Sequence, residues 1–140
     1  MNKIKNKLIF GTANLGVRYG INASNISKNS SLKKIFLLLK KEKIFFIDTA
    51  YNYKNAQKYL RKQHIKKFKV ISKIPKFKKE NLNILEEEII NHVEQSLKKL
   101  NISKFYALLV HDTKELNGNK GKKIFKILQL LKKRNMVGKI

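Results

Sequence analysis

The chain has 140 residues, a formal net charge of +24 and 42% hydrophobic residues. This length suffices for one domain with its own core, and the hydrophobic content favours a folded protein over a disordered one. The absence of cysteine excludes disulfide bonds and thiol chemistry. The apolar runs are too short for a signal peptide or for the roughly 20 residues of a membrane span, so we expect a cytoplasmic protein with no membrane partner.

Lysine supplies nearly all of the positive charge, because the only arginines are Arg18, Arg61 and Arg134. Arginine is the residue favoured for bidentate contacts to phosphates and bases. The lysines are also spread along the whole chain rather than gathered in one helix or loop. We therefore expect solvated basic faces and no specific nucleic-acid partner, with weak, non-specific binding of polyanions at low salt.

Short apolar runs alternate with amphipathic stretches along the chain. In chain order the expected elements are a strand at 7–10, a helix over 31–39, a strand at 44–47, a short helix around 56–60, a strand at 68–72, a helix over 85–100, a strand at 105–110, a helix over 124–131 and the start of a fifth strand at 136–140. The third helix has the clearest pattern, a stripe at spacings of three and four residues made of Leu85, Ile89, Val93, Leu97 and Leu100. No linker divides the chain, so we expect a single domain over residues 1–140.

Apolar strands that alternate with helices predict an α/β protein with a parallel sheet and right-handed crossovers. Periodicity alone leaves two architectures open. One is a small doubly wound open sheet. The other is a partial (β/α)8 TIM barrel, with about four βα units and the start of strand five.

Three consecutive expected strands each end in an ionisable residue, namely Asp48, Lys73 and His111. The carboxyl ends of parallel strands lie at one edge of the sheet, where α/β proteins build their sites. Tyr53 follows Asp48 by five residues, in the loop above the same strand. We therefore expect these four side chains to converge in an acid–base set that lacks the spacing of a metal site.

These residue types suit the reduction of a carbonyl group. A tyrosine hydroxyl has a pKa of about 10 in water, and a neighbouring lysine ammonium lowers such a pKa. An aspartate paired with the lysine keeps the ammonium charged and fixed, and a histidine can hydrogen-bond the carbonyl oxygen. Each residue alone also has a purely structural interpretation, as a loop cap, a surface side chain or a satisfied histidine at the rim of the sheet.

The sequence around these residues resembles the aldo-keto reductase family. The run IDTAYNY at 47–53 matches the family's Asp-Thr-Ala-x-x-Tyr signature, and VISK at 70–73 matches the strand that carries its lysine. Three further stretches are similar to the first strand and loop, the third helix and the fourth strand of the family: FGTANLG at 10–16 with YGI at 19–21, VEQSLKKL at 93–100, and LLVHD at 108–112.

The resemblance implies a (β/α)8-barrel oxidoreductase that uses NADPH to reduce an aldehyde, ketone or sugar carbonyl. Tyr53 is then expected to be the general acid, and Lys73 to assist the loss of its proton. Asp48 is expected to pair with Lys73 near the nicotinamide, and His111 to orient the substrate carbonyl. The residues expected beside the cofactor are Gly11, Thr12 and Asp48.

Two features of the sequence depart from the family. The family's tyrosine is usually followed by Gly-x-Ser/Ala-Glu, where this chain has Lys-Asn-Ala-Gln at 54–57. A full barrel needs about 250 residues, so we expect a truncated, N-terminal half-barrel. In the family, strands five to eight and their loops hold most of the cofactor, so we expect carbonyl reduction to be incomplete in this chain alone.

An alternative function from another class is a catalytically silent half-barrel that acts as a binding or assembly module or has no activity. Its expected partner is a second copy in a homodimer or the missing C-terminal half-barrel, whereas the enzyme's partner is a small-molecule carbonyl substrate. A third hypothesis, a small polyanion-binding protein, rests on the charge alone.

Overall fold

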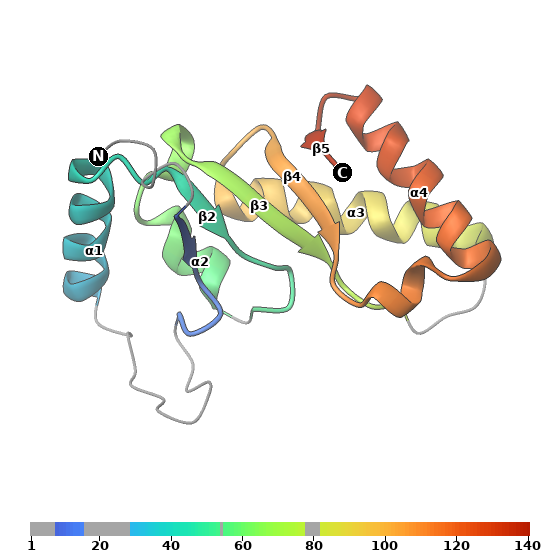
Figure 1. Cartoon of the computed structure of the whole chain (residues 1–140), viewed down its shortest axis with the longest axis horizontal. Coiled ribbons are helices and arrows are strands. Elements are labelled where there is room, and N and C mark those ends of the chain that lie inside the picture. The colour runs from blue at the N-terminus through green and yellow to red at the C-terminus, as the bar shows by residue number, and fades with distance from the viewer. Residues whose placement is uncertain (1–7, 16–28, 54, 78–81) are drawn as a thin grey trace.

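The structure is a computed structural model that describes residues 8–15, 29–53, 55–77 and 82–140. Among these residues are two 3-10 turns, η2 (Ile65–Lys67) before β3 and η3 (Thr113–Leu116) after β4. The stretch 19–21 and the residues Arg18 and Lys54 lie outside the described residues. The strands and α-helices are, in chain order (Figure 1), β1 (Ile9–Gly11), α1 (Asn29–Lys41), β2 (Phe46–Asp48), α2 (Ala56–Arg61), β3 (Lys69–Ile74), α3 (Leu82–Leu100), β4 (Phe105–Val110), α4 (Gly118–Lys133) and β5 (Val137–Lys139).

All five strands pair in parallel, in the order β1-β2-β3-β4-β5. Each strand therefore lies beside the strand that precedes it in the chain, and Figure 1 shows them side by side with α3 behind β3 and β4. A doubly wound sheet reverses its strand order at a switch point, whereas a (β/α)8 barrel continues in one direction. Of the two architectures that periodicity leaves open, the in-order sheet is therefore part of a barrel.

The sheet buries one face because successive side chains along a strand point to opposite sides. In β3, Val70, Ser72 and Ile74 are buried, whereas Lys69 is exposed and Ile71 is half-buried. The buried face is the one covered by helices. On the opposite face of β3, Lys73 is half-buried near the carboxyl end of the strand, so solvent can reach its side chain.

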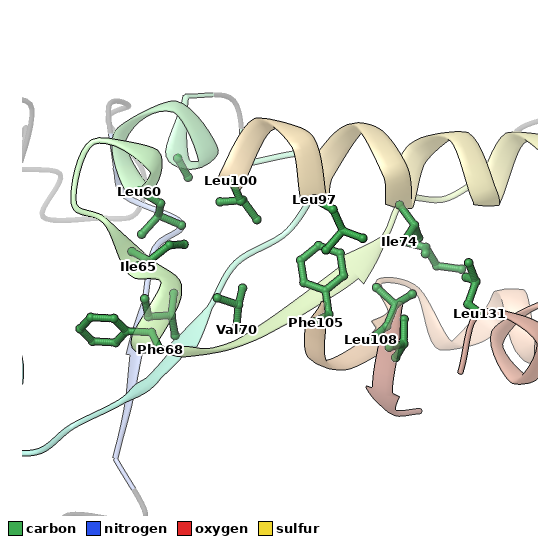
Figure 2. Packing of buried hydrophobic residues seen from close by; sticks show 14 of the residues in the cluster. Leu60, Ile65, Phe68, Val70, Ile74, Leu97, Leu100, Phe105, Leu108 and Leu131 are labelled. Atoms are coloured by element: carbon green, nitrogen blue, oxygen red, sulfur yellow. The ribbon is translucent and has the colours of Figure 1, made fainter. Parts of the chain in front are cut away.

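The core forms between the buried face of the sheet and the helices. Figure 2 shows Leu97 and Leu100 pointing from α3 toward the strands that carry Val70 and Phe105. The stripe predicted for α3 is buried along its whole length, with no member more than 8% exposed: Leu85, Ile89, Val93, Leu97 and Leu100. Burying one such side chain stabilises the fold by about 1.5–3 kcal/mol, so the stripe anchors α3 behind the strands.

The element bounds differ from the predicted ones by a few residues. β1 and β2 begin later than predicted, at Ile9 and Phe46, because these two residues form the first pair of the ladder. β3 continues to Ile74, so Lys73 lies one residue before the end of the strand rather than at its end. The two 3-10 turns were not predicted, because elements of three and four residues are too short to show periodicity.

Candidate active site

The carboxyl ends of β2 and β3 bring Asp48 and Lys73 into contact. In the ladder Asp48 pairs with Ile71, two residues before Lys73. The Lys73 ammonium donates to Oδ1 of Asp48 at 2.5 Å and to the carbonyl oxygen of Thr49 at 3.3 Å. The side chains of Lys73 and Asp48 are 18% and 32% exposed, so solvent and small molecules can reach the ion pair.

Tyr53 and His111 lie beside this ion pair. The Lys73 ammonium is 5.4 Å from the centre of the Tyr53 ring, whose centre is 6.1 Å from that of the His111 ring. A tight turn holds Tyr53 near the strand end, since its N–H donates to the Ala50 carbonyl oxygen at 3.2 Å. His111 directly follows β4, and its N–H donates to the Ile74 carbonyl oxygen at 3.2 Å. The structure thus gathers all four predicted side chains at one edge of the sheet.

Gly11 and Thr12 place the end of β1 beside Asp48. Gly11 pairs with Asp48 in the ladder, and the N–H and hydroxyl of Thr12 donate to the Asp48 carbonyl oxygen at 3.0 and 2.9 Å. Thr12 is buried, and these two hydrogen bonds join the end of β1 to the end of β2. Apart from its chain neighbours, no described atom lies within 4 Å of the position that a Cβ would take on Gly11. Among the described residues, the position next to the Asp48 backbone is therefore unfilled.

The contacts behind Lys73 were not predicted from the sequence. Thr49 is buried, and its hydroxyl has no hydrogen-bond partner among the described residues. The Tyr51 ring packs edge-on against His92 of α3, with ring centres 4.2 Å apart. Burial lowers the pKa of His92 below its ordinary value of 6.5. Helical spacing places His92 next to the buried stripe, but it does not show which loop the ring meets.

A buried carboxylate ties the loop after β3 to the segment after β4. Oε2 of Glu115 accepts hydrogen bonds from the backbone N–H of Phe77 at 3.3 Å and from the Lys120 ammonium at 2.8 Å. Lys120 also donates to the Phe77 carbonyl oxygen at 2.8 Å. Glu115 is only 6% exposed, so water does not replace these contacts. The three contacts among Glu115, Phe77 and Lys120 fix the segments that follow Lys73 and His111.

Asp112, next to His111, begins η3. Its carboxylate accepts a hydrogen bond from the Lys114 N–H at 3.0 Å. This bond, assisted by the charge of Lys76, holds the pKa of Asp112 below its ordinary value of 3.8. The charged carboxylate therefore caps η3 and orients the segment that follows His111.

The gathered groups are a carboxylate, an ammonium, a phenol and an imidazole. Among the residues that the structure describes, no three His, Asp or Glu side chains gather as they would around a metal ion. Within the same residues, no helix is both long and apolar enough to cross a membrane.

Comparison with known families accounts for this arrangement. The family model described as Aldo/keto reductase family matches residues 7–140, which include every residue of the site. The chain belongs to the aldo/keto reductase family. This confirms the resemblance that the signature at 47–53 and the lysine strand at 70–73 indicate.

Two solved structures from Pseudomonas aeruginosa, both provisionally described as aldo-keto reductases, share the fold of this aldo/keto reductase chain. The TM-scores are 0.72 at 22% sequence identity and 0.70 at 20% identity. The alignments cover 93% of this chain but only 52% and 51% of the others. The chain thus spans about half the length of the structures it matches. A search of curated protein sequences found no match.

Proposed function

We propose that this half-barrel carries the catalytic tetrad of an NADPH-dependent reductase of aldehydes, ketones or sugar carbonyls. The observation that carries the proposal is the 2.5 Å contact between Lys73 and Asp48, beside the Tyr53 ring. A lysine fixed by a carboxylate stabilises a neighbouring phenolate, so the tyrosine can release its proton to a substrate.

NADPH, held beside Gly11, Thr12 and Asp48, would provide hydride for the carbonyl carbon. Tyr53 donates its hydroxyl proton to the carbonyl oxygen, which yields the alcohol and leaves a phenolate on Tyr53. The Lys73 ammonium stabilises that negative charge, and Asp48 holds the ammonium in place. His111, with its ring centre 6.1 Å from that of Tyr53, donates a hydrogen bond to the carbonyl oxygen and so orients it.

The residues at the end of β1 fit the nicotinamide end of the cofactor. No described residue fills the space beside Gly11, and the side chain of Asp48 is one-third exposed. Gly11, Thr12 and Asp48 would hold the nicotinamide and its ribose there. In the family, the contacts to the pyrophosphate and the adenosine come mostly from the half of the barrel that this chain does not span. We therefore propose weak NADPH binding and slow turnover by the chain alone.

Carbonyl-dependent oxidation of NADPH at high protein concentration tests the proposal. Tyr53→Phe removes the proton donor, so its rate should fall by about 10²–10⁴-fold while NADPH affinity stays nearly unchanged. Tyr59→Phe is the matched control, because Tyr59 lies on α2 and packs against the core. If Tyr53→Phe kept more than half of the activity, another residue would have to be the acid.

A second candidate function, an assembly module, is favoured by apolar side chains exposed at the borders of the half-barrel. In a closed barrel, neighbouring strands and helices cover such side chains. Within the described sheet, β1 and β5 each pair on one side only, which leaves open strand edges. The exposed apolar residues in or next to β1, α1, α4 and β5 are Leu8, Ile9, Leu37, Leu38, Phe125 and Ile140. We propose that a second copy or a complementary C-terminal half-barrel covers them.

Light scattering over a concentration series, with NADPH titrated by fluorescence, separates the two candidates. An assembly module should have the mass of a dimer or larger species and no NADPH-dependent turnover. Combining Leu38→Lys with Phe125→Lys should shift that mass toward the monomer. A stable monomer with micromolar NADPH affinity and steady turnover would show instead that the half-barrel suffices as an enzyme.

A further inference from the structure

The loop between β2 and α2 supplies two groups of the candidate active site. Tyr53 is the proposed acid, and the Thr49 carbonyl oxygen accepts a hydrogen bond from the Lys73 ammonium at 3.3 Å. The described backbone hydrogen bonds of Tyr53 join it to Ala50 at 3.2 Å and to Ala56 at 2.7 Å, each three residues away. Bonds of such short range close the turn, but they do not set where the turn lies relative to Lys73.

Tyr51, two residues before Tyr53, anchors the loop on α3. Its ring meets His92 edge-on with ring centres 4.2 Å apart, and the Lys99 ammonium lies 5.0 Å from the ring centre. Its hydroxyl donates to the side-chain oxygen of Gln95 at 3.4 Å. His92, Gln95 and Lys99 are spaced by three and four residues, so they lie on one face of the helix. One side chain of the loop is thus held by two turns of α3.

Gln57, four residues after Tyr53, forms a second anchor on the same helix. Its side-chain amide donates to the Ser96 hydroxyl at 3.0 Å. Gln57 and Ser96 are only 4% and 3% exposed, so breaking this bond would leave a buried polar group without a partner. Gln57 stands where the family usually has a glutamate, and a neutral amide can be buried beside a hydroxyl without a counter-ion. Because Ser96 directly follows Gln95, the two anchors reach neighbouring positions on α3.

We propose that α3 positions Tyr53 against Lys73, acting through Tyr51 and Gln57. The proposal rests on the proposed function, since it gives Tyr53 the role of the acid. The buried stripe of α3 already fixes this helix behind β3, the strand that carries Lys73 (Figure 1). The same helix then holds the loop on both sides of Tyr53. One rigid element therefore sets the distance between the acid and the lysine that assists it, and Tyr51 and Gln57 are positioning residues.

The contacts of Tyr51 are directional, whereas simple packing of the loop on α3 would need only an apolar side chain. An edge-on ring pair and an ammonium over the ring face each favour particular orientations of the ring. The backbone next to this ring also reaches the strand of the lysine, since the Tyr51 N–H donates to the Lys73 carbonyl oxygen at 3.5 Å. The orientation of the Tyr51 ring is thus coupled to the backbone at the candidate active site.

Hydrogen exchange at the backbone amide of Tyr53, followed by NMR, tests the positioning without requiring turnover. Tyr51→Ala should speed this exchange by about tenfold relative to the amides of β3, because losing an aromatic contact favours local opening to about that extent. Tyr51→Phe keeps the ring against His92, so its exchange should stay near that of the original chain. Tyr106→Ala is the matched control, because Tyr106 is also half-buried with lysine side chains over its ring but lies near the start of β4.

Carbonyl-dependent oxidation of NADPH measures the consequence for the reaction. Tyr51→Ala and Gln57→Leu should each lower kcat by about 10–100-fold, because a misplacement of about 1 Å near the reacting groups can cost that much. The KM for the carbonyl and the affinity for NADPH should stay nearly unchanged, and Tyr51→Phe should restore kcat. The double variant Tyr51→Ala/His92→Ala should be no slower than Tyr51→Ala, since both changes remove the same contact.

Unchanged exchange at Tyr53 in both Tyr51→Ala and Gln57→Leu would overturn the proposal, whether or not the chain reduces carbonyls. An unchanged kcat in these variants, in a chain that Tyr53→Phe inactivates, would also overturn it. Equal acceleration at Tyr53 and throughout β3 would show that the whole fold loosens and would count against a positioning role. Full activity of Tyr53→Phe would overturn the proposed function instead, and the exchange rates would still show whether α3 holds the loop. The two anchors are tested separately, so if one variant does not fold, the other decides.

Discussion

The backbone N–H of Phe77 donates to the carboxylate of Glu115 at 3.3 Å, across 38 residues of sequence. Lys120 completes the contact by donating to both residues at 2.8 Å. The loops after β3 and β4 are therefore joined at the edge of the sheet where Lys73 and His111 lie. One buried carboxylate sets the relative position of these two strand ends.

Glu115→Gln should lower the free energy of unfolding by about 1–3 kcal/mol, because the neutral amide loses its charge-assisted bond to Lys120 and weakens the one to Phe77. Urea unfolding measures this difference. Glu94→Gln changes an exposed carboxylate of α3 and should stay within about 0.5 kcal/mol of the original chain. Equal midpoints for the two variants would show that the Glu115 contacts do not stabilise the fold.

Gly121→Ala should destabilise the chain even though alanine favours helices. A Cβ at this position would lie 1.9 Å from the carbonyl oxygen of Leu116 and 2.1 Å from its carbonyl carbon. These are backbone atoms, so the start of α4 must shift, at a cost of about 1–3 kcal/mol or more. Thermal unfolding beside Gly11→Ala, where a Cβ meets no atom of the described residues within 4 Å, measures the effect. A melting temperature as high as that of Gly11→Ala would contradict the predicted clash.

Mild acid should destabilise the chain through His92. Burial, assisted by the charge of Lys99, lowers the pKa of His92 below 6.5, while Glu88 opposes the shift. The unfolded chain therefore binds the proton more readily, so stability is lost as the pH falls from about 6.5 toward the folded pKa. The pKa of Asp112 is lowered below 3.8, so the stability it contributes is lost only at more acidic pH.

His92→Gln should reduce this loss, measured as the difference in urea midpoint between about pH 7.5 and about pH 5.5. His64→Gln is the control, because His64 is exposed in the turn before η2. If the midpoint of His92→Gln fell as far as that of the original chain, the acid sensitivity would have to come from another group.

Lys73→Met should separate stability from the proposed chemistry. The pair with Asp48 is partly open to solvent, so its removal should change the free energy of unfolding by only about 0–1 kcal/mol. Carbonyl reduction should fall by about 100-fold or more, because Tyr53 loses the cation that stabilises its phenolate. Lys76→Met breaks the 3.6 Å pair with Asp112 at the same edge and should keep the rate. NADPH oxidation and urea midpoints on the same preparations decide between these outcomes.

Local patterns in the sequence predicted the strands and α-helices, because each βα unit buries its own apolar stripe. They also predicted where Asp48, Lys73 and His111 would lie, since parallel strands end at one edge of the sheet. The contact between Lys73 and Asp48 follows from that geometry together with opposite charge.

Contacts between two irregular segments could not be predicted in this way. Neither Glu115 nor Lys120 belongs to a periodic pattern, and their meeting with Phe77 depends on how two loops fold against each other.

The in-order sheet has a consequence for how the chain folds. From β2 onward, each strand of the described sheet pairs with the strand synthesised just before it, so no pairing has to span an intervening strand. Connections between neighbouring strands, closed one after another, cost less entropy than a pairing between distant strands, and more local contacts favour more rapid folding. The sheet can therefore grow while the chain leaves the ribosome. The edge that carries Asp48, Tyr53, Lys73 and His111 is complete once β4 has docked on β3.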